Sequence, residues 1–172
     1  MDHRGACGCD PNSGDGAGVL LQIPHEFFLE ESRKLGFSLP APGQYGVGMI
    51  FFPNQENLIK ECKEVIERKS KKLGLRLIGY RIVPVNNGDI QGADSGKAEP
   101  SIQQLFIERP ETCATEIDFE RKLYVFRQYV TRLLNETIPA LESKFYFTSL
   151  SCRTIIYKGM LTTMQVPGYF KD

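Results

Sequence analysis

Residues 3–18, which read HRGACGCDPNSGDGAG, form the most specific stretch of the chain and lead directly into the apolar run of residues 19–23. The glycines, aspartates, asparagine and proline of this stretch are typical of a tight loop. The apolar run ends at Pro24 and predicts a short buried strand. A dinucleotide-binding loop would follow a strand and open a helix. Because this loop precedes a strand, we do not interpret it as a dinucleotide site.

The next segments predict a helix and a central strand. Residues 25–35 carry apolar side chains at roughly helical spacing, and Gly36 provides a C-terminal stop. Residues 45–52, which read YGVGMIFF, are rich in β-forming residues. They predict a central strand in which Gly46 and Gly48 permit close packing.

Two longer helices and further strands follow. We expect Asn54 to cap the first helix and Asp118 to cap the second, because apolar residues spaced three and four apart come after each. Glycine, asparagine and aspartate in residues 86–97 predict a mobile loop. Strands are predicted over residues 75–83 and 101–107, a strand pair over residues 145–150 and 154–157, and the start of a helix over residues 161–172. This order of elements indicates an α/β or α+β architecture.

Composition narrows the class of protein. With 172 residues, of which 41% are hydrophobic and 24% charged, the chain fits one globular domain or one large piece of a domain. The 21 basic and 21 acidic residues balance, so no electrostatic attraction to nucleic acid or to an anionic membrane is expected. No apolar run approaches the roughly 20 residues of a membrane span, and the N-terminus does not resemble a signal peptide.

The five cysteines do not form a disulfide or metal pattern. Their number is odd and their spacing irregular, which favours reduced thiols. Cys7 and Cys9 are separated by one residue, but a zinc site would need a second pair of ligands. The only histidines, His3 and His25, are not placed to supply it. We therefore predict no metal site.

The loop and several later stretches together resemble the glutaminase domain at the N-terminus of the glutamate synthase large subunit. This domain is a type-2 glutamine amidotransferase. The similar stretches keep the same order and cover nearly the whole chain. Besides residues 3–18 they are IPHEFF at 23–28, YGVGM at 45–49, EPSIQQLF at 99–106, FERKLY at 119–124, SLSCRT at 149–154 and YKGML at 157–161.

The resemblance implies a fold and a reaction. The fold is α+β, the four-layer α-β-β-α sandwich of N-terminal-nucleophile hydrolases, and residues 1–172 would form a single partial domain that is incomplete at both ends. A cysteine at the mature N-terminus hydrolyses glutamine, with its own α-amine as the base. The ammonia passes through a tunnel to a synthase domain that converts 2-oxoglutarate to glutamate. The cofactors, FMN and an iron–sulfur cluster, belong to those other domains, and none is expected in this chain.

The resemblance also assigns site residues. Arg4 of the His-Arg-Gly motif would face the glutamine pocket, where its fixed guanidinium suits an oxygen ligand, and Gly5 would let the backbone approach closely. A purely structural role for Arg4 in bracing the loop is the alternative. Cys7 and Cys9 are internal, so they lack the free α-amine that would activate them. No catalytic residue is therefore assigned.

Two functions remain open at this point. The first is a part of the glutaminase domain that is inactive alone, with glutamine as the substrate of the parent enzyme and its remaining domains as partners. Such a chain would lack the nucleophile before residue 1 and the arginine motif and Asn-Gly oxyanion donors beyond residue 172. The second is a degenerate module that binds glutamine or docks on a synthase. The expected location is the cytoplasm, or the plastid in a plant or alga.

Overall fold

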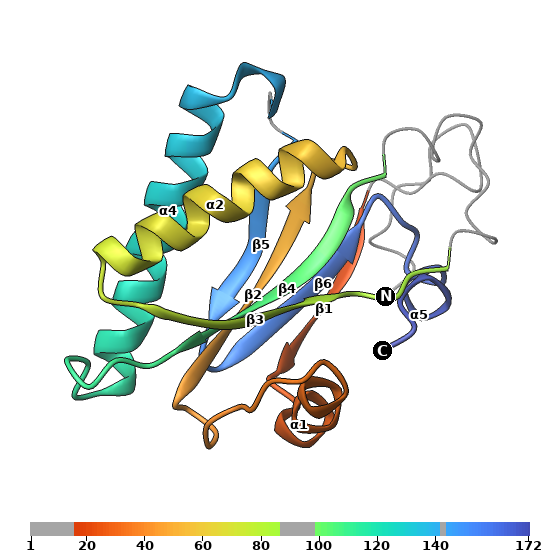
Figure 1. Ribbon diagram of the computed structural model, residues 1–172. Coiled ribbons are helices and arrows are strands. Elements are labelled where there is room, and N and C mark those ends of the chain that lie inside the picture. Colours follow the sequence, from red (N-terminus) through yellow and green to blue (C-terminus); the bar gives the residue numbers. More distant parts are fainter. Residues whose placement is uncertain (1–15, 87–98, 142–143) are drawn as a thin grey trace. The chain divides into compact units, whose positions relative to one another are not determined.

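The computed structural model describes residues 16–86, 99–141 and 144–172 and is a mixed α+β structure (Figure 1). The elements follow the predicted order, with a short 3₁₀ helix before β5 and a one-turn helix at the end. The α+β class is therefore confirmed, and antiparallel strands with helices are consistent with the sandwich expected from the resemblance. The chain divides into two compact units, which we describe separately: residues 21–82 with 100–155, and residues 1–20 with 83–99 and 156–172.

The larger unit is built on a four-stranded sheet in the order β3-β4-β2-β5. Neighbouring strands are antiparallel throughout. The bounds are β2 Tyr45–Phe52, β3 Arg76–Ile82, β4 Ser101–Glu108 and β5 Tyr146–Ser151. All eight residues of β2 are buried, which confirms that it is a central strand.

Gly46 shows why β2 needs a residue without a side chain. A Cβ at this position would lie 2.7 Å from Leu123 Cδ1 and 3.3 Å from the Ser151 carbonyl oxygen. Both distances are shorter than ordinary van der Waals contact. The close packing predicted for Gly46 is thus confirmed, and it lets helix α4 approach the sheet.

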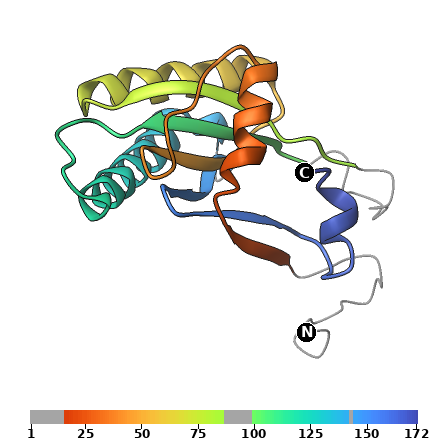
Figure 2. The same cartoon turned by 90° about the horizontal axis from the view of Figure 1, so that it is seen from below.

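Two helices, α2 (Glu56–Lys72) and α4 (Glu116–Thr137), pack on one face of this sheet. Their buried side chains form one apolar core with Ile50 and Phe52 of β2 and Leu105 and Ile107 of β4. The predicted helical faces are confirmed, with Cys62, Val65 and Ile66 buried in α2 and Leu123, Phe126, Val130 and Leu134 in α4. In Figure 2, α2 runs alongside β3.

The opposite face of the sheet contacts helix α1 (His25–Lys34). Phe28 of α1 lies edge-on to Phe106 of β4, with ring centroids 5.2 Å apart. Arg81 of β3 is only 5% exposed, and it pairs with Glu31 of α1 at 2.9 Å. It also donates a hydrogen bond to Gln104 Oε1 at 3.0 Å. A buried guanidinium therefore ties α1 to the sheet.

Both predicted N-caps are wrong in position. Helix α2 follows Gln55, whose side chain makes no capping hydrogen bond, so Asn54 is not the cap. Helix α4 is capped by Thr115, which accepts a hydrogen bond from the Asp118 backbone, while the Asp118 carboxylate accepts one from the Thr115 backbone. Asp118 is thus the third helical residue of a capping box, because its carboxylate reaches back to the cap rather than forward.

The predicted pairing of the last two strands is also wrong. β5 pairs with β2, whereas β6 (Thr154–Gly159) pairs with β1 (Ala17–Gln22) in a separate two-stranded sheet. The two residues between β5 and β6 therefore carry the chain from one sheet to the other instead of closing a hairpin. β1 itself forms where predicted, but it is largely exposed rather than buried, because β6 is its only partner among the described strands.

The smaller unit has its own aromatic cluster. Tyr157 of β6 and Tyr169 of helix α5 (Val166–Tyr169) both pack edge-on against Phe170, with centroid distances of 5.0 and 4.8 Å. The helix predicted in residues 161–172 is thus confirmed only as one turn. The loop predicted at residues 86–97 falls almost wholly outside the described residues. In the described ranges, no helix combines the length and the apolarity needed to cross a membrane.

Candidate functional site

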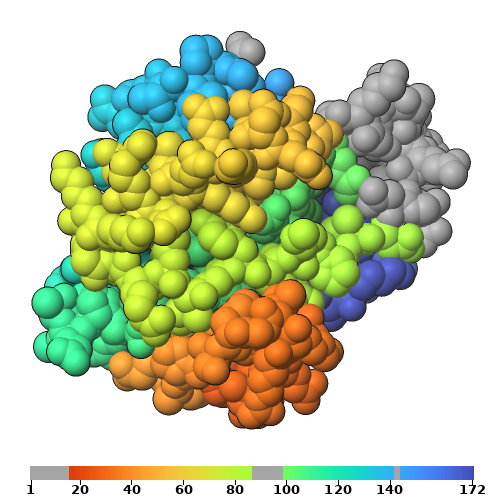
Figure 3. All heavy atoms as spheres, viewed as in Figure 1, coloured from red at the N-terminus to blue at the C-terminus, as the bar shows by residue number. Residues whose placement is uncertain are grey.

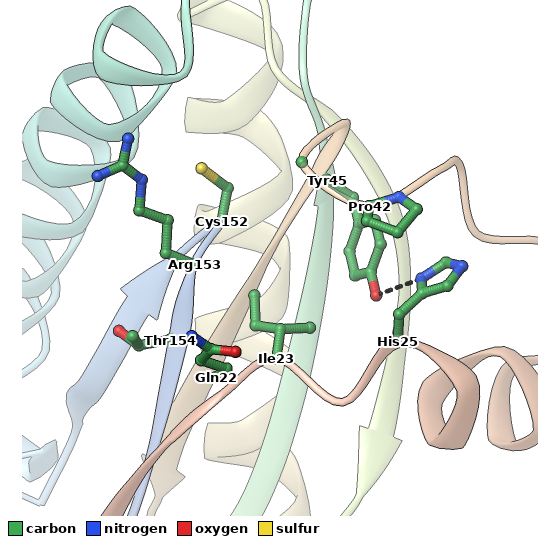
Figure 4. A pocket seen from close by; sticks show the side chains of 9 residues that line it. Gln22, Ile23, His25, Pro42, Tyr45, Cys152, Arg153 and Thr154 are labelled. Atoms are coloured by element: carbon green, nitrogen blue, oxygen red, sulfur yellow. Dashed lines mark hydrogen bonds between the residues drawn. The ribbon is translucent and has the colours of Figure 1, made fainter.

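A cavity of about 430 Å³ lies within the larger unit, where three segments of the chain meet (Figure 4). The end of β1 and the start of α1 provide one wall, the turn before β2 a second, and the turn between β5 and β6 a third. Its lining residues are Gln22, Ile23, His25, Pro42, Gly43, Tyr45, Cys152, Arg153 and Thr154.

Three of the stretches that carry the family resemblance converge on this cavity. Ile23 and His25 belong to the IPHEFF stretch, and Tyr45 opens YGVGM. Cys152, Arg153 and Thr154 end the SLSCRT stretch. The resemblance rests partly on these stretches but assigns no role to any of their residues. Their convergence could not be read from the sequence because Ile23 and Thr154 lie 131 residues apart.

A hydrogen bond between Tyr45 and His25 forms one side of the cavity. Tyr45 Oη and His25 Nδ1 lie 3.1 Å apart, and Figure 4 shows the two side chains facing each other. Burial, followed by the charge of Glu26, raises the pKa of Tyr45 to about 12. The phenol therefore stays protonated at neutral pH and can serve as a neutral hydrogen-bonding group.

The opposite wall is the turn between β5 and β6, and helix α4 holds it in place. Glu120 of α4 accepts hydrogen bonds from the Ser151 hydroxyl at 2.8 Å and from the Cys152 backbone N–H at 2.6 Å. Glu116, one turn earlier, pairs with Arg153 at 3.0 Å. Two carboxylates on one side of α4 thus fix the conformation of this wall.

The wall formed by the end of β1 and the start of α1 is tied to the same turn through the backbone. The N–H of Ile23 donates to the carbonyl of Arg153 at 3.0 Å. Within the turn, the Ser151 hydroxyl accepts hydrogen bonds from the N–H groups of Arg153 and Thr154 at 3.0 and 3.2 Å. These backbone hydrogen bonds therefore link two of the three walls of the cavity.

Cys152 is not suited to act as a nucleophile in this cavity. Burial raises its pKa to about 12, and the hydrogen bond to Glu120 and the charge of that carboxylate add to the increase. At pH 7 only about one thiol in 10⁵ would be ionised, and the thiolate is the reactive form. The thiol of Cys152 therefore does not supply covalent chemistry in this cavity.

The residues assigned from the resemblance, Arg4 and Gly5, lie outside the described residues, as does His3. The structure therefore gives no position for the glutamine-facing motif, and the assignment stays a prediction. Cys62, Cys113 and Cys152 are free and buried, as expected for reduced thiols. In the part of the chain that the structure describes, no three His, Cys, Asp or Glu side chains gather as metal ligands would.

Comparison with known proteins identifies the family. A family model described as glutamine amidotransferases class-II matches residues 1–172. The glutamate synthase [NADPH] large chain of Bacillus subtilis is 42% identical over 173 residues, which cover all of this chain and 11% of that protein. The ferredoxin-dependent glutamate synthase 1 of Arabidopsis thaliana, named chloroplastic/mitochondrial, is 38% identical over all of this chain and 10% of its own length.

A fungal relative shows the same pattern. The glutamate synthase [NADH] of Schizosaccharomyces pombe is 36% identical over the whole of this chain and 8% of its own length. The chain thus spans about a tenth of the length of the curated relatives it matches. With a family model matched from the first residue to the last, this chain belongs to the class-II glutamine amidotransferases.

Proposed function

We propose that this chain is part of the glutaminase domain of a glutamate synthase, the domain that releases ammonia from glutamine. The observation that carries the proposal is the match over all 172 residues both to the amidotransferase family and to three glutamate synthases. In the remaining domains the ammonia, together with two electrons and protons, would convert 2-oxoglutarate to glutamate and water. FMN and an iron–sulfur cluster would be held there rather than by the residues of this chain.

We further propose that these 172 residues are inactive by themselves. The proposed reaction needs a thiolate beside a free α-amine. Cys62, Cys113 and Cys152 are internal and buried, and burial raises the pKa of Cys62, like that of Cys152, to about 12. In a well-studied protease, loss of the nucleophile lowers kcat by about 10⁶. Glutamine hydrolysis by the isolated chain should therefore be undetectable.

A glutaminase assay tests this proposal. The purified 172-residue chain is compared with the B. subtilis glutamate synthase large chain at equal molar concentration, and ammonia or glutamate release is measured. We expect no release above the buffer control. Turnover within about a hundredfold of the B. subtilis protein would contradict the proposed inactivity and would show that the chain contains its own nucleophile.

The cavity favours a second candidate, a module that binds glutamine without hydrolysing it. Tyr45, His25, Arg153 and Gln22 line the cavity, and their polar side chains can form hydrogen bonds with an amino acid. Isothermal titration with glutamine, and with asparagine as a shorter comparison, tests this candidate. Heat of binding at millimolar glutamine that Tyr45→Phe weakens would support it, and absence of heat would exclude it. Location in cytoplasm or plastid stays a prediction.

A further inference from the structure

Helix α4 has apolar side chains on two opposite sides. Phe119, Leu123, Phe126 and Val130 point into the core and are fully buried. On the side away from the core, Ile117, Tyr124 and Val125 are 53%, 60% and 54% exposed. A helix at the surface of a finished protein normally has one apolar side, and a helix that is apolar all round is normally buried. The outer side of α4 therefore has the composition of a contact surface.

On an ideal helix these exposed residues fall on one side. At about 100° per residue, Ile117, Tyr124 and Val125 fall within an arc of roughly 100°, and Arg121 lies in the middle of it. We call these four residues the α4 outer face. Tyrosine and arginine are enriched among the residues that dominate binding energy at protein interfaces. An apolar centre that includes an arginine is thus typical of a protein contact.

The neighbouring helix shows what a solvated surface looks like in this molecule. Helix α2 also packs on the core, and its outward residues include Lys60, Glu61, Glu64 and Lys71. The large exposed hydrophobic residues of the described chain include none from α2. Its surface is the yellow region across the front of Figure 3. The α4 outer face is therefore a local property of α4 and not of the whole helical layer.

The relatives indicate what covers this face. Each is about ten times longer than the chain, so roughly nine-tenths of such a polypeptide lies outside these residues. We propose that the α4 outer face is the contact through which this domain packs against the rest of a glutamate synthase large chain. This inference rests on the proposed function. The opposing surface would be apolar around Tyr124 and Val125, whereas Arg121 is already paired with Asp118 of the same helix at 3.5 Å.

The contact would also restrain the part of α4 that holds one wall of the cavity. Glu116 and Glu120, which hold the turn between β5 and β6, are in the same first turns of α4 as Ile117 and Arg121. A partner packed on the α4 outer face would limit motion of the helix segment that fixes this cavity wall. The remaining domains could therefore influence the cavity without touching it.

Cysteine labelling tests the proposed contact directly. Tyr124→Cys, Val125→Cys and the control Glu64→Cys, an exposed position on α2, are made in the 172-residue chain. The same variants are made in the B. subtilis large chain with its matching 173 residues replaced by this sequence. Maleimide labelling rates at each site are measured by mass spectrometry. We expect labelling of positions 124 and 125 to fall at least tenfold in the long chain, and that of position 64 to change less than twofold.

Each outcome decides the inference. Equal labelling of positions 124 and 125 in the short and long chains would overturn it. Protection already present in the short chain, with a dimer in sedimentation, would overturn it in favour of a second copy. Glutamine-dependent and ammonia-dependent glutamate formation by the long chain are measured separately. Loss of only the glutamine-dependent activity in the unsubstituted long chain would count against the proposed function and leave the labelling result valid.

Discussion

Strands β1 and β2 are both apolar, yet β1 is mostly exposed to solvent and β2 is buried. β2 reads YGVGMIFF and all its residues are buried, whereas β1 reads AGVLLQ and is exposed from its second residue to its last. β2 is paired on both edges and covered by α2 and α4, while β1 has β6 as its only partner among the described strands. Apolar composition thus predicts a strand, but the neighbours of that strand determine whether it is buried.

The largest expected effect of this difference is at Phe52. Its side chain is fully buried and packs edge-on against Phe145 at 5.5 Å. Phe52→Ala should lower the free energy of unfolding by about 3–5 kcal/mol, because the lost contacts leave a cavity in the core. Urea unfolding followed by circular dichroism measures the change. Leu20→Ala in β1, which is 62% exposed, is the control and should cost less than about 0.5 kcal/mol.

Gly46→Ala probes how closely β2 is packed. The new methyl group would lie 2.7 Å from Leu123 Cδ1, so α4 or the strand must shift. We expect a loss of about 1–3 kcal/mol in the free energy of unfolding, as for other overpacked cores. Gly168→Ala is a matched control, since a Cβ there meets nothing within 4 Å. Equal unfolding midpoints for the two variants would show that the contact with Leu123 is not tight.

Glu31→Gln tests how the four-stranded sheet tolerates a buried charge. Arg81 would lose its carboxylate partner while remaining nearly inaccessible to water. Because Glu31 itself is 21% exposed, we expect a cost of about 1–2 kcal/mol at pH 7 rather than the larger cost of a fully buried pair. Glu67→Gln breaks an exposed pair with Lys71 and should cost less than about 0.5 kcal/mol.

Glu31→Gln should also change how the free energy of unfolding depends on pH. Hydrogen bonds from Lys34 and Arg81 lower the pKa of Glu31 below its ordinary value of 4.5. A lowered pKa in the folded state means that the ionised carboxylate stabilises the fold above pH 4.5. This stabilisation is lost as the pH falls through the lowered value. The difference between wild type and Glu31→Gln should therefore shrink below pH 4.5, and a constant difference would contradict this account.

The smallest expected effect is at the exposed strand. Leu20→Lys places a charge on β1 where the side chain is 62% exposed, so the free energy of unfolding should change by less than about 0.5 kcal/mol. A loss above about 2 kcal/mol in the 172-residue chain would mean that β1 is buried in solution. The contrast with β2 would then fail.

Much of the secondary structure could be predicted because it depends on local pattern. The period-three and period-four apolar residues of α2 and α4 and the β-forming run of β2 locate these elements within a few residues. The caps were misplaced because Asn54 and Asp118 are both good capping residues, and only the chain path shows which residue precedes the first helical turn. The pairing of β5 was missed because β2 lies about a hundred residues away.

The cavity could not be predicted, although most of its lining residues lie in stretches that carry the family resemblance. Nothing in the sequence distinguishes Arg153 from any exposed arginine. Its ion pair with Glu116 and its backbone hydrogen bond with Ile23 join three separate segments of the chain. From the sequence alone, Cys152 could be a reactive thiol. Its low reactivity is visible only in the structure, where burial and the neighbouring Glu120 raise its pKa. Both features arise from contacts between segments that have no relation in the sequence.

By itself the sequence determined the family, the order of the elements and the inner faces of the helices, because motifs and apolar periodicity are local properties of the chain. Only the tertiary structure decided that β5 and β6 belong to different sheets and that β1 is exposed. It also decided that Ile117, Tyr124 and Val125 of α4 remain more than half exposed. These features depend on which distant segments share a core, because burial belongs to the packed arrangement and not to any one segment.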